Sequence, residues 1–231
     1  MRTKLLIIIF FIGLSCSAQE YLSGFSYNNE AADDVRLMKK RSDVISLPFF
    51  DDFTESDVAP DASKWQNKNV LVNSGFPLFP ANYNAATFDA LDATGKVYTH
   101  ASSSPFVADS LISNPISLSD LTPADSIYLS FYYQPQGNGD APETNDSLVL
   151  MFGYMPDSVM IWDHIWSSPG MTLDSFLIEN DNQYFKQILI PVTKKEYFEN
   201  ELVILFYNYA SITSTMYPND RSNVDNWNID F

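Results

Sequence analysis

Carboxylates are the side chains in this sequence whose types and spacing allow chemistry. Asp140, Glu143 and Asp146 lie within one short stretch, residues 137–146, which is also rich in glycine and asparagine. Clustered carboxylates suit a calcium site, which needs several oxygen ligands. They also suit a glycosidase pair, which needs two carboxyl groups on either side of a sugar. The stretch lacks the regular Asp-x-Asp-x-Asp-Gly spacing of an EF-hand loop, so a solvated hairpin loop is the third interpretation.

A second acidic set comes from the two ends of the chain's apolar region. Asp51 and Asp52 lie near its start, and Asp225 and Asp230 lie near its end. In many β-sandwiches the first and last strands lie side by side. The hypothesis is therefore that these carboxylates meet around one calcium ion.

Aromatic residues make up 15% of the chain and suggest a stacking surface. Trp162, Trp166 and Trp227 are the candidates for stacking on sugar rings, because an indole offers a large flat apolar face. In an unbroken strand His164 shares a face with Trp162 and Trp166. The tyrosines of two expected strands, Tyr128, Tyr132, Tyr133, Tyr207 and Tyr209, are further candidates. The alternative is that these rings fill a sandwich core.

Several kinds of chemistry find no support in the sequence. His100 and His164 are the only histidines, and neither belongs to an HExxH zinc motif. The chain also lacks the Gly-x-Ser-x-Gly elbow, Ser-x-x-Lys, the Walker phosphate loop and GxGxxG. The formal net charge of −16 argues against nucleic acid as a partner, because such binders need basic residues to displace phosphate counterions. Of the enzyme chemistries considered, the acidic pair is the one that stays open.

The N-terminal residues have the pattern of a secretory signal peptide. Arg2 and Lys4 precede an apolar run at residues 5–12, and small residues follow up to Ala18. This pattern predicts cleavage after Ala18, export to the periplasm, outer membrane or exterior, and no transmembrane segment in the mature chain. Acylation at Cys16, the only cysteine, is the alternative; the lipobox is imperfect because its leucine is missing three residues before the cysteine.

The rest of the chain predicts an all-β fold after a short leader. Residues 19–46 are polar and read as an arm or a short helix. From residue 47 onward, short apolar or alternating runs are separated by Pro, Gly, Asn, Asp and Ser, which is typical of an all-β sandwich or barrel. We expect strands at residues 70–73, 85–91, 110–118, 126–133, 147–153, 162–166, 185–192, 202–210 and 227–231, and a two-turn helix at 193–200.

The order of motifs from residue 47 onward resembles that of a known family. The segments that carry this are LPFFDDF (47–53), ATFDALD (86–92), ADSLISNPISL (108–118), DSIYLSFYYQP (125–135), DSLVL (146–150), NYAS (208–211) and DNWNIDF (225–231). They resemble the jelly-roll β-sandwich of exported Bacteroidota proteins linked to type 9 secretion and gliding. At lower detail they are similar to cleaved-adhesin and MAM domains.

The resemblance implies a jelly roll of two antiparallel sheets over residues 47–231. It also implies a non-catalytic protein-interaction module at the cell envelope, either an adhesin domain or a plug-like accessory subunit that contacts an outer-membrane or secretion-system protein. In related jelly rolls a structural calcium lies near the opening acidic residues and the closing strand, and Asp52 and Asp230 match those positions. A carbohydrate-binding module for polysaccharide is the alternative, and an acidic-pair glycoside hydrolase is a third. Type 9 cargo normally ends in a sorting domain, for which no sequence follows Phe231; we therefore expect a fragment or a periplasmic protein.

Overall fold

The computed structural model describes residues 44–212 and 224–231. The signal peptide, Cys16 and most of the arm predicted at 19–46 lie outside the described residues. The strands are β1 (Ile45–Ser46), β2 (Leu71–Asn73), β3 (Ala85–Phe88), β4 (Phe106–Ile112), β5 (Ile116–Ser117), β6 (Tyr128–Pro135), β7 (Ser147–Tyr154), β8 (Ile161–Pro169), β9 (Lys186–Pro191), β10 (Val203–Ala210) and β11 (Trp227–Asp230). Two short α-helices, α2 (Leu173–Glu179) and α3 (Glu196–Glu199), and two 3₁₀ turns, Pro123–Asp125 and Pro156–Ser158, complete the described elements.

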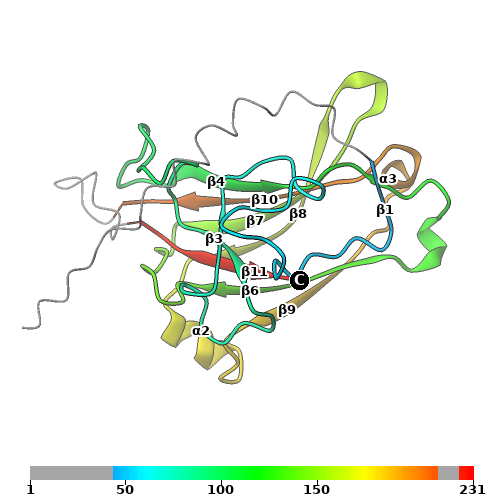
Figure 1. Cartoon of the computed structure of the whole chain (residues 1–231). Helices are drawn as coiled ribbons and strands as arrows, with labels where there is room; N and C mark the ends of the chain where they lie inside the picture. The colour runs from blue at the N-terminus through cyan, green and yellow to red at the C-terminus, as the bar shows by residue number, and fades with distance from the viewer. Residues whose placement is uncertain (1–43, 213–223) are drawn as a thin grey trace, which may run out of the picture.

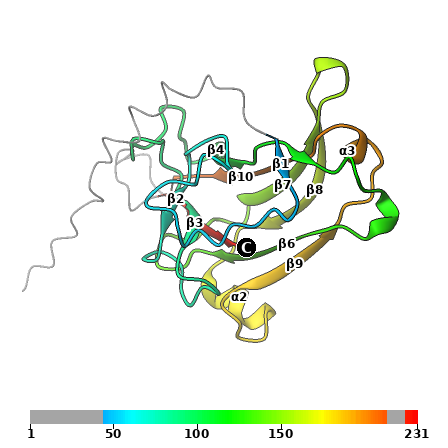
Figure 2. The same ribbon diagram turned by 45° about the vertical axis from the view of Figure 1, so that its right-hand side comes forward.

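Nine of the eleven described strands form two packed sheets, which Figures 1 and 2 show as an upper and a lower layer. One sheet has the order β4-β10-β7-β8 and the other the order β2-β3-β11-β6-β9, and all pairings within them are antiparallel. Apart from β2, these strands have the order of a double Greek key, with β3-β11-β6-β9 in one sheet and β4-β10-β7-β8 in the other. The expected jelly-roll β-sandwich is therefore confirmed.

Alternating side chains explain how the two sheets pack. Leu148, Leu150 and Phe152 of β7 point inward, and so does Phe206 of β10. Phe206 lies 4.9 Å, between ring centroids, from Phe131 of β6 in the other sheet. Edge-to-face contacts of this kind add to the free energy gained by burying apolar surface. The core thus joins residues far apart in the sequence, as a sandwich requires.

The five-stranded sheet is covered on part of its outer side by residues 74–84. Gln134 of β6 links this segment to the sheet: its Nε2 donates to Leu78 O at 2.9 Å, and its Oε1 accepts from Leu78 N at 2.9 Å. Asn82 reaches Asp230 at the end of β11 through its backbone N–H and its side chain. Buried polar side chains such as these need partners, and the covering segment supplies them.

Three local expectations change once the structure is known. The strand expected at 110–118 is two strands, because the chain leaves the sheet at Asn114, whose N–H donates to Lys64 O instead. Helix α2 was missed; only its Phe176 is buried, so seven residues give little 3.6-residue apolar pattern. Ile45 and Ser46, placed by sequence in the arm, pair in parallel with β5.

No helix among the described residues is long and apolar enough to cross a membrane.

Candidate functional site

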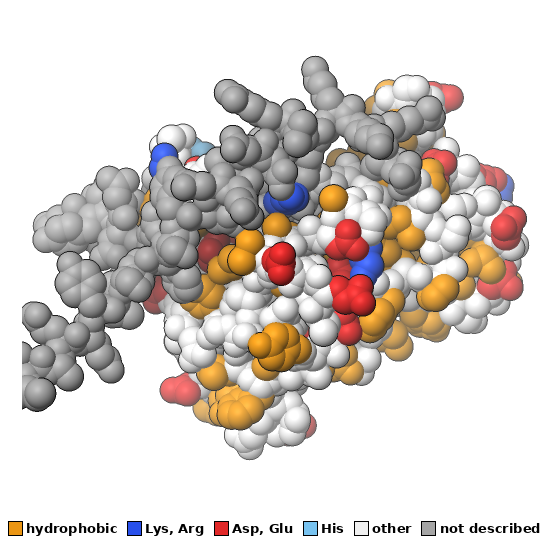
Figure 3. All heavy atoms as spheres, in the orientation of Figure 1, with side chains coloured by type: hydrophobic (Ala, Val, Ile, Leu, Met, Phe, Trp, Pro, Cys, Tyr) orange, Lys and Arg blue, Asp and Glu red, His pale blue; other side chains and the backbone are white. Residues whose placement is uncertain are grey.

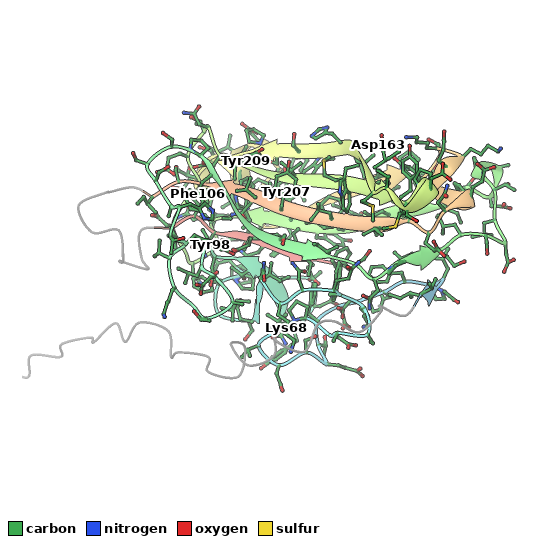
Figure 4. All side chains as sticks on the ribbon, turned by 90° about the horizontal axis from the view of Figure 1, so that it is seen from above. Lys68, Tyr98, Phe106, Asp163, Tyr207 and Tyr209 are labelled. Atoms are coloured by element: carbon green, nitrogen blue, oxygen red, sulfur yellow. The ribbon has the colours of Figure 1, made fainter. Side chains whose placement is uncertain are left out.

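The outer side of the β4-β10-β7-β8 sheet carries a group of aromatic and apolar side chains. Register and alternation place them opposite the core. We call this surface the aromatic face, and it consists of Val107, Ser110, Ile112, Ser147, Val149, Met151, Trp162, His164, Ser167, Leu205, Tyr207 and Tyr209. Figure 4 looks onto this sheet and shows Tyr207 and Tyr209 along β10, between β4 and β7.

The two tyrosines form the centre of the aromatic face. Their ring centroids are 5.6 Å apart and the planes are inclined by 65°. Both rings are partly exposed, and they occupy alternate positions of β10, so they share one side of the strand. Burial, and next the neighbouring Tyr209, raise the pKa of Tyr207. The Tyr207 phenol therefore keeps its proton at neutral pH and offers a hydroxyl donor next to apolar ring surface.

Trp162 lies against a strand position where only glycine fits. It pairs with Gly153 of β7, and a Cβ added to Gly153 would come within 2.5 Å of the indole ring. The missing side chain lets the indole lie over Gly153 of β7. Gly153 pairs with Val203, four positions along β10 from Tyr207, so Trp162 and the two tyrosines share one side of the sheet at positions roughly 13 Å apart along the strands.

The aromatic face has no charged side chain among its members, although the chain has a net charge of −16. The two acidic residues on these four strands point away from it. Asp109 is fully buried, where its Oδ2 accepts from Ala90 N at 2.7 Å. Asp163 pairs with the core residue Phe152 and contacts Lys194. On the side of the molecule drawn in Figure 3, by contrast, acidic side chains are scattered among apolar ones.

The structure separates the three tryptophans that were predicted to bind a ligand. The pairing of β8 with β7 shifts register between Leu150 and Met151. This β-bulge places His164 on the aromatic face and Trp166 on the core side, so the expectation that they share a face is wrong. Trp166 packs edge-on against Phe131 and Tyr133, at 5.2 and 4.9 Å between centroids.

Trp227 is also a core residue. Its exposed fraction is 0%, so it has no surface on which a sugar could stack, and a ligand-binding role does not fit this position. Of the three tryptophans, Trp162 alone joins the surface formed by Tyr207 and Tyr209.

The acidic residues near the start of the domain serve mainly local structure. Asp51 accepts from the Trp65 indole at 2.6 Å and from Lys64 Nζ at 3.0 Å. Asp52 accepts from Thr54 N at 3.0 Å. Asp230 is bound by Asn82, and burial, with a smaller contribution from Asp52, raises its pKa. Asp52 and Asp230 are therefore neighbours, each with its own hydrogen-bond partners, and calcium binding by this pair stays a prediction.

A different acidic cluster forms where the two predicted sets meet. One carboxylate oxygen from each of Glu143, Asp146 and Asp225 lies within 4.8 Å of the others. The 138–146 loop and the start of β11 come together through a parallel bridge between Asp140 and Asp225 and through Asn226 N donating to Asp140 O at 3.1 Å. The sequence-based prediction included all three acids but assigned them to two separate sites. The loop and the last strand are neighbours only through the pairing of the strands, which residue spacing does not show.

The cluster is buried and strongly acidic. Asp146 and Asp225 are each 1% exposed. Ser211, just after β10, connects them: its Oγ donates to Asp146 Oδ2 at 2.7 Å, and its N–H donates to Asp225 Oδ2 at 2.7 Å. Burial, and then the charges of Glu143 and Asp146, raise the pKa of Asp225 to about 10. Three carboxylates this close need a proton or a cation between them.

The burial of the cluster does not suit a glycosidase pair. Such enzymes hold two carboxyl groups on either side of an accessible sugar. Here two of the three side chains are buried. Asp140, the remaining acid of the predicted loop, contacts the segment of Asp225 through its backbone. The geometry thus favours a cation over a glycosidic bond.

A charged contact that residue spacing does not indicate lies at the other end of the same sheet. Lys194 Nζ lies 2.6 Å from Asp163 Oδ2 and 3.0 Å from Tyr154 Oη, and 4.4 Å from the centre of the Tyr154 ring. Tyr197 of α3 donates to the same carboxylate at 2.8 Å. The hydrogen bond from Lys194 lowers the pKa of Asp163 and raises the pKa of Lys194. This contact ties α3 to β7 and β8.

Comparison with known proteins identifies no family for this chain. No protein-family model matches it, and no curated protein matches it. Among solved structures, one match is a non-crystalline cellulose specific carbohydrate-binding module, CBM28. It is 12% identical, the match covers 70% of this chain and 78% of that one, and the TM-score is 0.34. A likeness this distant carries no argument about function.

Proposed function

We propose that this chain is a non-catalytic binding module that holds a neutral polysaccharide on the aromatic face. The observation that carries the proposal is that Trp162, Tyr207 and Tyr209 lie on one outer, uncharged side of a sheet in a strongly acidic protein. The fold supplies a paired sheet, and the rings come from β8 and β10, on either side of β7. Their positions relative to one another therefore do not depend on a loop.

The chemistry of the aromatic face matches that of a sugar chain. Pyranose rings present C–H groups on their faces and hydroxyl groups around their edges. Aromatic side chains pack against the C–H faces, while tyrosine hydroxyls and an indole N–H supply polar contacts at the rim. Ser110, Ser147 and His164 add further hydrogen-bonding groups on the same side of the sheet.

Charge separates this ligand from other classes. A nucleic acid or an acidic polysaccharide requires basic residues, and the aromatic face contains none. A basic ligand gains most from carboxylates, which lie elsewhere on this molecule. A neutral polymer carries no charge that needs an opposite charge on the protein, so an uncharged surface suits it.

Affinity electrophoresis in gels that contain a neutral polysaccharide tests the proposal. Soluble β-glucans, xylan, mannan and an uncharged α-glucan form the panel, with pectate and DNA as charged comparisons. We expect the wild-type protein to be retarded by at least one neutral polymer. Tyr207→Ala and Tyr209→Ala should each reduce retardation severalfold. Each variant loses a tyrosine ring on which a sugar can stack, while the strands of the sheet remain paired.

Tyr128→Ala is the matched control. Tyr128 is 53% exposed on the other sheet, on β6, so its removal should leave retardation unchanged. Loss of binding in Tyr128→Ala with full binding in Tyr207→Ala would place the ligand on the other sheet. No retardation by any neutral polymer at saturating concentration contradicts the proposal.

A protein partner is the second candidate, and β9 is the feature that favours it. This strand is an edge of the five-stranded sheet, and Leu189 on its outer side is 58% exposed. An exposed edge strand can accept a further strand from a partner. The sequence resemblance suggests that such a partner would be an outer-membrane or secretion-system protein, in keeping with the predicted export of the chain.

Pull-down from detergent-solubilised envelope membranes tests this second candidate. The matched variants are Leu189→Lys, which introduces a charge on the free edge, and Tyr207→Ala on the aromatic face. Recovery of an envelope protein that Leu189→Lys abolishes and Tyr207→Ala retains supports docking at β9. Equal recovery with both variants argues against it.

A further inference from the structure

We propose that Glu143, Asp146, Asp225 and the Ser211 hydroxyl form a calcium site that fastens the 138–146 loop to the ends of β10 and β11. This site differs from the Asp52 and Asp230 pair, and it makes no use of the aromatic face.

Geometry brings the ligand atoms together from three separate segments. Glu143 and Asp146 belong to the loop that leads into β7, Ser211 follows β10, and Asp225 precedes β11. One oxygen of each acid lies within 4.8 Å of the others. Ser211 Oγ lies 2.7 Å from Asp146 Oδ2 and 3.1 Å from Glu143 Oε2. One ion placed among these oxygens would contact all three segments.

Unpartnered oxygens point to a ligand independently of the acidic cluster. Asp146 Oδ1 and Asp225 Oδ1 are buried and accept no hydrogen bond. The side chains that carry them are 1% exposed, so solvent does not compensate them. A buried carboxylate oxygen without a donor is costly, and native structures that contain one usually hold an ion or water there.

The lysines of three ion pairs in the described part of the chain contact other acids: Lys64 pairs with Asp51, Lys194 with Asp163 and Lys195 with Glu199. A cation bound in the cluster would offset the charge of its carboxylates.

The donor set favours calcium over other cations. All of the candidate ligands are oxygens, and calcium accepts six to eight of them in variable geometry. Magnesium demands a nearly ideal octahedron and retains several waters, which suits a site with two buried acids poorly. Glu143 is exposed, so water can complete the calcium shell on that side.

Close packing around the 138–146 loop holds the proposed calcium ligands in place before an ion binds. Gly170 N donates to Asp146 O at 2.8 Å, and a Cβ on Gly170 would meet Glu143 O at 1.9 Å. Gly139 is packed equally tightly against Asn226. These contacts hold the loop backbone against its neighbours, so binding an ion there would require little rearrangement.

Thermal unfolding of the chelator-treated protein, with calcium or magnesium added back, tests the inference. A free ion at about 100 times its Kd should raise the Tm by about 5 °C or more. We expect this shift with calcium and a much smaller one with magnesium. Titration calorimetry of the same protein should show a calcium-binding step that Asp225→Asn removes.

Variants locate the site. Asp225→Asn and Asp146→Asn should abolish the calcium-dependent shift, whereas Asp120→Asn, at an exposed acid elsewhere, should retain it. Glu143→Gln, at an exposed side chain, serves if the buried variants do not fold, and it should weaken calcium binding at least tenfold.

Two results would overturn the inference. One is an absence of both a Tm shift and binding heat at millimolar calcium, which would mean that the carboxylates share a proton instead. The other is a calcium response that persists unchanged in Glu143→Gln and Asp225→Asn. Both readouts are independent of polysaccharide binding, so failure of one proposal leaves the other intact.

Discussion

At the scale of single residues, burial decides which aromatic side chain has which role. Trp162 and Trp227 look alike in the sequence, because both alternate with other residues in an expected strand. In the structure Trp162 is partly exposed on the aromatic face and Trp227 is fully buried between the sheets. Residue type could identify candidates, and only the packing of the two sheets could separate surface from core.

Replacing these two tryptophans should have opposite consequences. Trp162→Ala should weaken polysaccharide binding severalfold and change the free energy of unfolding by less than about 1 kcal/mol. Trp227→Ala should reduce the free energy of unfolding by about 3–5 kcal/mol, because it leaves a cavity in the core. Urea unfolding together with affinity electrophoresis measures both quantities. Equal destabilisation by the two variants would contradict the assignment.

The contact between Asp163 and Lys194 gives a prediction about pH. The pKa of Asp163 is lowered in the folded protein, mainly by the hydrogen bond from Lys194. Its contribution to stability is therefore present above the unfolded pKa of about 3.9 and is lost as pH falls through the lower folded value. Both side chains are about one-third exposed, so the contribution is about 1 kcal/mol or less.

Urea unfolding of the wild-type protein and Asp163→Asn between pH 6 and pH 2 measures this contribution. We expect the wild type to be slightly more stable at pH 6 and the difference to vanish toward pH 2. A difference that stays constant across the range would mean that the carboxylate acts by packing alone.

At the scale of elements, alternation predicted the strands well and the irregularities poorly. The expected runs at 126–133, 147–153 and 202–210 correspond to β6, β7 and β10, because half-buried strands show a clear two-residue period. The bulge in β8 inserts one residue into the ladder and reverses the side on which Trp166 lies. Nothing in the spacing of residues 162–166 reveals this shift, since it depends on the pairing partner.

Gly153 provides a prediction for the pairing of β7 with β8. Gly153→Ala would place a Cβ within 2.5 Å of the Trp162 ring, so the ring must move. We expect weaker polysaccharide binding with the aromatic residues all still present, and a smaller loss than in Trp162→Ala. Gly75→Ala is the control, because its Cβ would meet only Asn73 Oδ1, at 3.9 Å. Unchanged affinity in Gly153→Ala would remove Trp162 from the binding surface.

At the scale of the whole molecule, the sequence indicated the jelly roll more completely than the candidate site. Motif order and strand spacing were enough for the two-sheet fold, because both are properties of the chain in sequence order. The acidic cluster and the aromatic face each combine distant segments: Glu143 with Asp225, and Trp162 with Tyr207. Such combinations require the order of strands in each sheet, which composition and spacing do not contain.

The distribution of charge over the molecule predicts how salt affects binding. The net charge is −16, and the aromatic face contains no charged member. Salt screens interactions between charges and has little effect on contacts between uncharged groups. We expect the affinity for a neutral polysaccharide to change less than twofold between about 50 mM and 500 mM NaCl, measured by titration calorimetry. A steep decrease in affinity would indicate a charged ligand.

Binding on the aromatic face is tested most directly by an NMR titration of the ¹⁵N-labelled protein with an oligosaccharide from the polymer that retards it. We expect progressive shifts of the Trp162 indole N–H and of backbone amides in β7, β8 and β10, with the Trp65 and Trp227 indole signals and the β9 amides unchanged. Shifts confined to β9 and β6, or none at saturating oligosaccharide, would contradict binding on the aromatic face.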